Sequence, residues 1–180
     1  ITRKNLKQNI LNTVPSSWQN YDAVIAKRIY VDNVKFTKLL KKGFRNYIKD
    51  PSILYDNKKH SVKLHFDMFH GYGILDKAID LLNINDREDF REYVNKNLFF
   101  NPHNMFVAKR KIMDEWFKSV FDWLFKCEEK FGIKNLTGYE KRLYGYIGER
   151  YLSYWFNKYT NPIEWDWVFV DMNKGKRTNI

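Results

Sequence analysis

The chain has 180 residues, of which 44% are hydrophobic and 29% charged, with a formal net charge of +11. This composition excludes a disordered chain, and the length suits one domain. No apolar run approaches the ~20 residues of a membrane-spanning helix. The single cysteine, Cys127, excludes an internal disulfide and a zinc site built on cysteines, and it fits a reducing compartment. We expect one domain over residues 1–180.

The first hundred residues predict short helices around one buried strand. In chain order, the expected elements are a helix over 2–14 that ends before Pro15, a strand over 23–26, a helix over 33–49 that Pro51 closes, a helix from Leu75 after a break at 71–73, and a helix over 85–94.

The rest of the chain predicts a strand over 105–108, two long helices over 109–131 and 139–158, and an alternating strand over 165–170. Apolar residues recur every three or four positions on both helices. We expect the two helices to pack through Trp116, Phe117, Val120, Leu143, Ile147 and Trp155. The fold class that follows is α/β, rich in helices and poor in strands.

Positive charge is concentrated in one segment. Residues 27–60 hold ten Lys or Arg and three Asp, a local excess of +7. The excess indicates an anionic partner: a phosphate group, a phospholipid surface or a nucleic acid. On a helix over 33–49, one face would carry Lys35, Lys38, Lys42, Arg45 and Lys49. This face either is solvated or lies on an anionic membrane, with Leu40, Phe44, Tyr47 and Ile48 on or near the side that packs on the domain.

His65, Asp67 and His70 form a cluster that could hydrogen-bond a sugar or phosphate, or hold a metal. Five residues turn a helix by about 500°, so the two histidines would share a helix face poorly and a metal site would need irregular backbone. Ordinary half-buried histidines are the other interpretation. Gly71 and Gly73 follow directly and permit a tight turn.

Charged residues also flank the last long helix. Glu140 lies at its expected start, where the helix dipole favours a carboxylate and where a general base could face a cleft. Arg142, Glu149 and Arg150 lie among aromatic residues, so at least one of these charges must be paired or buried. Asn104 either presents its amide at a cleft or serves a turn.

Familiar catalytic signatures are absent from the 180 residues: there is no P-loop, Rossmann glycine pattern, nucleophile elbow or zinc spacing. Asp86, Glu88 and Asp89 could suggest an acidic metal motif, but their charged neighbours favour the solvated start of a helix. The residues alone therefore lead no further than a folded α/β domain with a basic segment.

Several motifs together resemble a known family. They are Asn104-Met105-Phe106-Val107-x-Lys109, the aromatic helix from Trp116 to Phe125, Tyr139-Glu140-x-Arg142-x-x-Gly145-Tyr146-x-x-Glu149-Arg150, and, upstream, the strand Tyr21 to Lys27 and the segment His65-Phe66 with His70. The family resembled is a group of bacterial glycosyltransferases of capsular and lipopolysaccharide synthesis, long filed as a domain of unknown function. The chain departs from it at Gly73-Ile74, where an acidic pair is usual, and at Glu140, where Gln is usual.

The resemblance implies the C-terminal part of a GT-A-like fold, because the family's N-terminal E-L-T-A and H-Y-R-R-Y-F motifs have no counterpart here. The chain alone is then expected to lack part of the nucleotide-sugar site and to be incomplete and inactive by itself. The implied reaction transfers a sugar from a nucleotide-sugar donor to a growing glycan, with a lipid-linked acceptor. The resemblance favours Glu140 as the base, with Asp67 second. It implies substrate binding by His65, His70, Asn104, Tyr139 and Arg142, and a structural or diphosphate-balancing role for Glu149 and Arg150.

The resemblance leaves the cofactor open, a divalent metal being compatible with the chemistry, and it implies a cytoplasmic protein that is peripheral on the inner membrane. Two alternatives come from other classes. One is a basic nucleic-acid-binding module, suggested by a pI of about 9.6 and 18% aromatic residues; the other is a non-catalytic membrane-docking module. No recognised nucleic-acid motif is present, so we expect no nucleic-acid partner.

Overall fold

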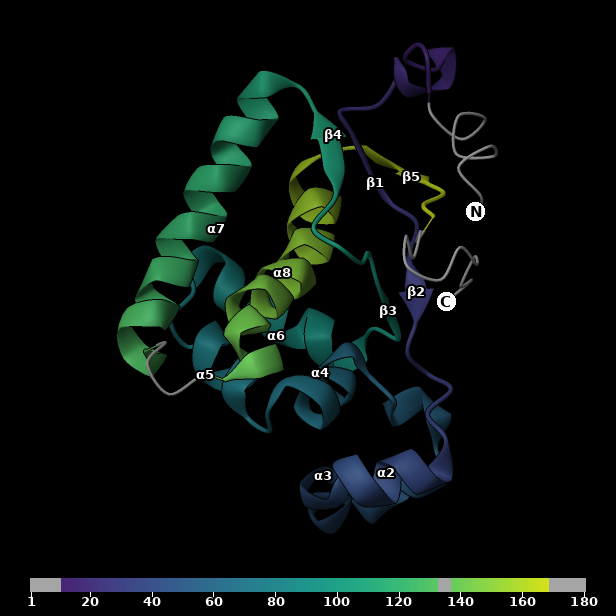
Figure 1. Cartoon of the computed structure of the whole chain (residues 1–180), viewed down its shortest axis with the longest axis vertical. Coiled ribbons are helices and arrows are strands. Elements are labelled where there is room, and N and C mark those ends of the chain that lie inside the picture. The colour runs from purple at the N-terminus through teal and green to yellow at the C-terminus, as the bar shows by residue number, and fades with distance from the viewer. Residues whose placement is uncertain (1–10, 133–136, 169–180) are drawn as a thin grey trace.

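The computed structural model describes residues 11–132 and 137–168 and shows a helix-rich mixed α/β fold with a few short strands, as expected (Figure 1). The strands are β1 (Ala23–Ala26), β2 (Ile29–Tyr30), β3 (Phe99–Phe100), β4 (Phe106–Ala108) and β5 (Pro162–Trp165). The α-helices are α2 (Phe36–Lys42), α3 (Phe44–Lys49), α4 (Val62–His70), α5 (Ile74–Ile79), α6 (Ile84–Lys96), α7 (Arg110–Phe131) and α8 (Leu143–Tyr159). Short 3-10 turns are η2 (Ser16–Trp18), η3 (Pro51–Leu54), η4 (Asn57–Lys59) and η5 (Gly138–Arg142).

β1 is the central strand of a three-stranded sheet with the order β4-β1-β5. Val24 lies opposite Val107 of the antiparallel β4 and opposite Ile163 of the parallel β5. All four residues of β1 are buried, which explains why its sequence is uniformly apolar. A separate antiparallel pair joins β2 to β3, with Ile29 opposite Phe100.

Helix α8 forms the centre of the hydrophobic core. It lies between α7 and the group of α4, α5 and α6 (Figure 1), and ten of its 17 residues are buried. Trp116 and Ile147 are 3% and 0% exposed, which confirms the expected packing of the two long helices. Phe117 is 38% exposed, so its expected place in that interface is wrong. One residue beyond Trp116, it turns outward and its ring lies 5.8 Å from that of Phe121.

Several boundaries differ from the expected ones. The helix expected over 33–49 is divided at Gly43, where a Cβ would lie only 2.9 Å from the carbonyl oxygen of Leu39. The last helix begins with the 3-10 turn η5. Of the helix expected over 2–14, residues 1–10 lie outside the described residues, and residues 11–14 are not helical.

The strand expected over 165–170 is also wrong. The chain instead forms β5 at Pro162–Trp165. This strand ends at Trp165, because Trp165 pairs with Ala26, the last residue of the short strand β1. Residues 166–168 are not in a strand, and residues 169 and 170 lie outside the described part.

The part of the basic segment that was expected to be one helix forms α2 and α3, which lie at the lower end of the molecule in Figure 1. Its cations Lys35, Lys38, Lys42, Arg45 and Lys49 are exposed. Leu39 faces inward to a small second core with Ile53, Leu64 and Met68. The expectation that Leu40, Phe44 and Ile48 pack on the domain is wrong: the row that faces the domain is Leu39, Gly43 and Tyr47, and the other three side chains are exposed. Among the described helices, none has an apolar stretch long enough to cross a bilayer.

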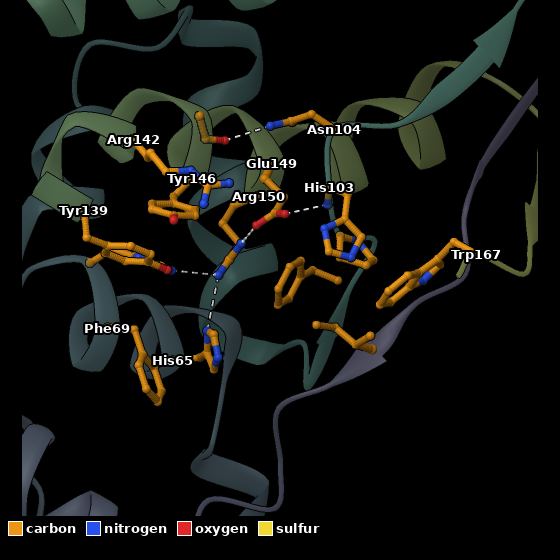
Figure 2. Close-up of a pocket in the computed structure, with 15 residues that line it drawn as sticks. His65, Phe69, His103, Asn104, Tyr139, Arg142, Tyr146, Glu149, Arg150 and Trp167 are labelled. Carbon is orange, nitrogen blue, oxygen red and sulfur yellow. Dashed lines mark hydrogen bonds and ion pairs between the residues drawn. The ribbon is translucent and has the colours of Figure 1, made fainter. Parts of the chain in front are cut away.

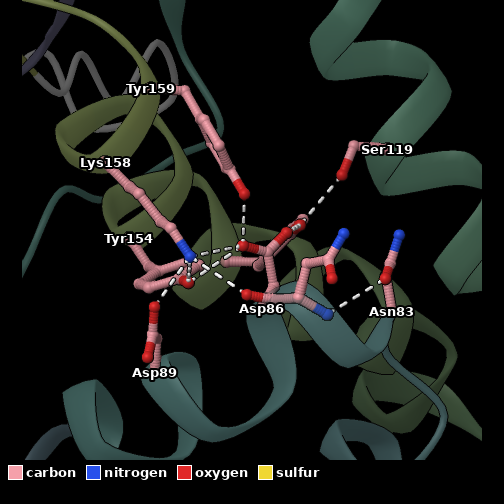
Figure 3. Close-up of polar contacts among 9 residues, drawn as sticks. Asn83, Asp86, Asp89, Ser119, Tyr154, Lys158 and Tyr159 are labelled. Carbon is pink, nitrogen blue, oxygen red and sulfur yellow. Dashed lines mark hydrogen bonds and ion pairs between the residues drawn. The ribbon is translucent and has the colours of Figure 1, made fainter.

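A buried carboxylate ties α6 to α8. Asp86, expected on a solvated helix start, is only 5% exposed. It accepts hydrogen bonds from the hydroxyls of Tyr151, Tyr154 and Tyr159, at 2.9, 3.0 and 2.6 Å (Figure 3). Lys158 donates to it at 3.0 Å. Burial alone would raise the pKa of Asp86, but these donors outweigh burial and hold the pKa below its ordinary value.

Candidate functional site

A cavity of about 480 Å³ opens between α4, the β3–β4 loop and the start of α8 (Figure 2). Seven residues that the sequence singled out line it: His65, His70, Asn104, Tyr139, Arg142, Glu149 and Arg150. The remaining lining residues are Ile29, Phe69, Phe100, Pro102, His103, Gly145, Tyr146 and Trp167.

Arg150 is the polar centre of the cavity wall. Its side chain is 1% exposed, and its guanidinium carbon lies 3.6 Å from the centre of the Phe100 ring. The guanidinium donates to the carboxylate of Glu149, and its second terminal nitrogen lies 3.2 Å from Nδ1 of His65 and 3.4 Å from Nε2 of His70. Burial lowers the pKa of Arg150 and Glu149 opposes that shift, so the guanidinium stays charged. The expectation of a paired or buried charge is confirmed for this pair.

The two histidines are neutral. Desolvation, and after it the positive charge of Arg150, lowers the pKa of each imidazole to about 3. Because each accepts a hydrogen bond from Arg150, we assign the ring proton to Nε2 of His65 and to Nδ1 of His70. The two histidines are five residues apart on α4, yet both rings contact the same group, because the guanidinium of Arg150 reaches both of them from α8.

The loop between β3 and β4 is held in an unfavourable conformation by α8. His103 and Asn104 have φ angles of +76° and +50°, in the left-handed region that residues with a side chain rarely adopt. The backbone N–H of His103 donates to the carboxylate of Glu149, and Nδ2 of Asn104 donates to the carbonyl of Gly145 at 2.8 Å (Figure 2). These contacts fix the loop as one wall of the cavity.

Aromatic rings and a cation form the opposite wall. The ring of Tyr146 stacks on His70 with centroids 4.0 Å apart, and Tyr139 lies 5.1 Å from Tyr146. The guanidinium carbon of Arg142 lies 5.3 Å from the centre of the Tyr146 ring. Arg142 is exposed and makes no ion pair within residues 11–132 and 137–168. Apolar ring faces beside an unpaired guanidinium can bind a sugar ring and an anionic group together.

Three buried polar atoms of the lining lack a hydrogen-bond partner in the described part of the chain. They are Nδ1 of His70, the hydroxyl oxygen of Tyr146 and Nε of Arg150. Buried polar groups in folded proteins are nearly always paired with protein or water. A ligand or ordered water in the cavity can pair with these groups.

Glu140 and Asp67 do not line this cavity. Both border an adjoining space of about 300 Å³, which shares Phe69, His70, Tyr139 and Tyr146 with it. The buried carboxylate of Asp67 accepts hydrogen bonds from Asn46, Lys63 and the backbone N–H of Gly73, at 2.8, 2.8 and 3.0 Å. These three donors give Asp67 a structural role.

Glu140 is exposed and accepts hydrogen bonds from the backbone N–H of Thr137 at 3.2 Å and from its hydroxyl at 3.4 Å. Thr137 and Glu140 thus form a capping box at the start of η5, where the sequence placed a carboxylate. Both hydrogen bonds go to Oε2, and within the described residues Oε1 accepts none.

Nothing in the described residues groups three or more His, Cys, Asp or Glu side chains so that they could hold a metal ion. His65 and His70 share a cation, the guanidinium of Arg150, at the position where a metal would have to bind.

Sequence reasoning missed part of the lining. Phe100, Pro102 and His103 lie within the four residues before Asn104, and this proximity was the signal that could have found them. Ile29 and Trp167 carried no such signal. They reach the cavity because β2 pairs with β3 and because the chain continues from β5 to Trp167, whose indole donates to the carbonyl of Lys27 at 3.0 Å.

Fold and cavity together define a helix-rich α/β domain whose site is built around a buried arginine and two neutral histidines. The family described as a domain of unknown function, DUF4422, matches residues 12–161, a span that holds every residue of the cavity lining except Trp167. The chain therefore belongs to the DUF4422 family. Comparison with curated proteins and with solved structures finds no match.

Proposed function

We propose that this domain is a glycosyltransferase, or the acceptor-side part of one, which transfers a sugar from a nucleotide-sugar donor to a growing capsular or lipopolysaccharide glycan. One observation carries the proposal. The residues to which the sequence resemblance assigns substrate binding line a single cavity: His65, His70, Asn104, Tyr139 and Arg142. The GT-A-like character of the fold is part of this proposal and rests on the same resemblance.

The charges of the cavity suit a nucleoside diphosphate. Arg142 is exposed and without an ion pair among the described residues, so it can neutralise the leaving diphosphate without breaking an ion pair. Arg150 is already held by Glu149, His65 and His70, and we assign it a positioning role. Because both imidazoles are neutral, they give the cavity hydrogen-bonding groups without adding positive charge and without repelling Arg150.

The proposed reaction needs a base. The acceptor hydroxyl attacks the anomeric carbon, the bond from that carbon to the diphosphate oxygen breaks, and the hydroxyl proton passes to a carboxylate. Glu140 is the proposed base, since it is exposed beside Tyr139 and Arg142 and holds only Thr137. Asp67 is the weaker candidate, because three donors already occupy its buried carboxylate. A divalent metal remains compatible with the chemistry, and no residue here is assigned to it.

Isothermal titration with UDP and with GDP, each with and without Mg²⁺, tests the donor part of the proposal. We expect one of them to bind, and Arg142→Ala to weaken that binding by about 10- to 100-fold, the usual loss for a charged hydrogen-bond partner. The matched control is Arg110→Ala, which removes a 93% exposed arginine of α7 and should leave the affinity unchanged. Equal affinity in wild type and Arg142→Ala, or no binding of either nucleotide, contradicts the donor part of the proposal.

A further inference from the structure

Three phenylalanine side chains of α7 point into solvent. Phe117, Phe121 and Phe125 are 38%, 47% and 64% exposed, and successive rings lie 5.8 and 6.0 Å apart. They recur every fourth residue, so they form one continuous stripe along the helix. We call these three residues the phenylalanine stripe. α7 lies at the outer edge of the molecule, on the left in Figure 1, with α8 on its inner side.

Charges of both signs border the phenylalanine stripe at its two ends. Arg110 and Lys111 begin α7, Glu128 and Glu129 lie near its end, and all four are exposed. Glu128 follows Arg110 by 18 residues, and Glu129 follows Lys111 by 18 residues. This interval is about five turns of an α-helix, so each cation and its carboxylate lie on the same side of α7, ~27 Å apart.

These charges are poorly compensated within the chain. Arg110 and Lys111 have only long contacts, of 3.8 and 3.9 Å, to carboxylates one turn further along the helix. Glu128 and Glu129 form no ion pair within residues 11–132 and 137–168. The helix therefore presents an apolar stripe together with charges that can gain partners from outside.

The pattern on α7 is complementary to itself when a second α7 runs antiparallel. In a twofold pair, if residue i contacts residue j of the other copy, then j also contacts i. A twofold axis beside the middle of α7 sets Phe117 against Phe121 of the second copy. Within one residue of the same register, opposite charges face each other at Arg110 and Glu128, Lys111 and Glu129, and Lys118 and Asp122. A parallel pair would instead set each charge against an identical one.

We propose that the phenylalanine stripe binds the same stripe of a second copy of this chain, with the two α7 helices antiparallel. Charge complementarity selects this occupant. An anionic bilayer or a nucleic acid would meet carboxylates along the stripe, at Asp122, Glu128 and Glu129, and these would repel it. A partner of another sequence would need the charge pattern that α7 itself carries.

Burial of the rings is expected to supply most of the affinity. Each exposed ion pair strengthens association by only about 1.4- to 5-fold, although the twofold axis makes every pair occur twice. The ion pairs therefore mainly fix the register, and the dimer should weaken modestly as salt is raised. The described lining of the candidate cavity includes no residue of α7, so dimerisation does not depend on the proposed enzymatic function.

Sedimentation equilibrium over a range of protein concentrations tests the role of the stripe. We expect a reversible dimer of the wild type. Phe121→Ser combined with Phe125→Ser should weaken it by about 100-fold or more, because four buried rings are lost from each dimer. The matched control is Phe44→Ser combined with Ile48→Ser, which removes side chains of α3 that are 56% and 61% exposed and should leave the dimer unchanged.

Charge reversal tests the antiparallel register. Lys111→Glu and Glu129→Lys should each weaken the dimer by about 10-fold, because two attractive pairs become repulsive. An equimolar mixture of the two variants should restore it, since one chain then carries two carboxylates and the other two lysines. Residues 111 and 129 are too far apart to meet within one chain, so this rescue can occur only between copies. The matched control is Lys130→Glu, which changes a charge on the side of α7 away from the stripe and should dimerise like the wild type.

Three results would overturn the proposal. The first is a wild type that stays monomeric at every soluble concentration, which would leave the stripe to a partner of another kind. The second is a dimer that the double phenylalanine variant does not weaken. The third is a mixture of Lys111→Glu and Glu129→Lys that associates no better than either variant alone. Circular dichroism of every variant separates dissociation from unfolding.

Discussion

Replacing Asp86 with Asn should destabilise the protein much more than the same change at Asp89, although Lys158 contacts both carboxylates, at 3.0 and 2.8 Å. Asp86 is 5% exposed and also accepts three tyrosine hydroxyls, whereas the side chain of Asp89 is 63% exposed. An amide at position 86 turns one acceptor into a donor and leaves Lys158 without its buried partner. Breaking a buried ion pair costs about 3–5 kcal/mol of the free energy of unfolding. Because Lys158 is partly exposed, we expect a loss of about 3 kcal/mol, at the lower end of this range.

Urea unfolding measures the free energy of unfolding of both variants, and thermal unfolding measures their Tm. For a chain of this size, a loss of about 3 kcal/mol in Asp86→Asn corresponds to a fall of roughly 6–12 °C in Tm. Asp89→Asn should cost about 1 kcal/mol or less, as breaking an exposed ion pair does. The comparison also depends on pH. Because the folded-state pKa of Asp86 lies below the ordinary value of 3.8, its stabilising contribution is present above that pH and is lost below it. The gap between wild type and Asp86→Asn should therefore narrow as the pH falls below 3.8. Equal losses for the two variants, or a gap independent of pH, would refute this reasoning.

Three further predictions concern the cavity and its edge. Arg150→Met should raise the pKa of both His65 and His70 from about 3 towards 6.5, because it removes the positive charge that, after desolvation, lowers them most. NMR titration of the two imidazoles measures these pKa values, and unchanged values would contradict the prediction. In the wild type, the free energy of unfolding should fall as the pH drops from 6.5 towards 3, because the unfolded chain binds protons that the folded imidazoles of His65 and His70 do not. Urea titrations at several pH values measure this fall, and a flat profile would count against it. Glu140→Gln should lower turnover by about 10² or more with an unchanged Tm, since Gln preserves the capping box with Thr137; steady-state kinetics with unchanged turnover would remove Glu140 as the base.

The longest periodic segments were predictable from the sequence. The apolar spacing of α7 and α8 located both helices and their packing through Trp116 and Ile147, and the run at 23–26 located β1. The two-residue strands β2 and β3 were not predictable, because two residues carry no periodicity. The exposure of Phe44 and the burial of Asp86 were equally hidden, since a helical pattern shows two faces but not which of them the tertiary structure covers.

The candidate site was predictable in part. The pairing of Arg150 with Glu149 followed from their aromatic surroundings, and motif residues far apart in the chain line one cavity. The contact of His65 and His70 with one guanidinium depends on how α4 meets α8, which no local pattern encodes. Trp167 reaches the cavity only through the parallel pairing of β1 with β5, a contact between residues about 140 positions apart.

A transfer assay tests the central claim most directly. The domain is assayed within the whole enzyme to which the proposal assigns it, with radiolabelled UDP- and GDP-sugars and synthetic lipid-linked oligosaccharides, and both the elongated lipid and the released nucleoside diphosphate are measured. We predict elongation with at least one donor, a loss of about 10- to 100-fold in Arg142→Ala, and wild-type activity in Arg110→Ala. Elongation that is unaffected by Arg142→Ala, or no release of nucleoside diphosphate from any donor, would contradict the assignment of this cavity to sugar transfer.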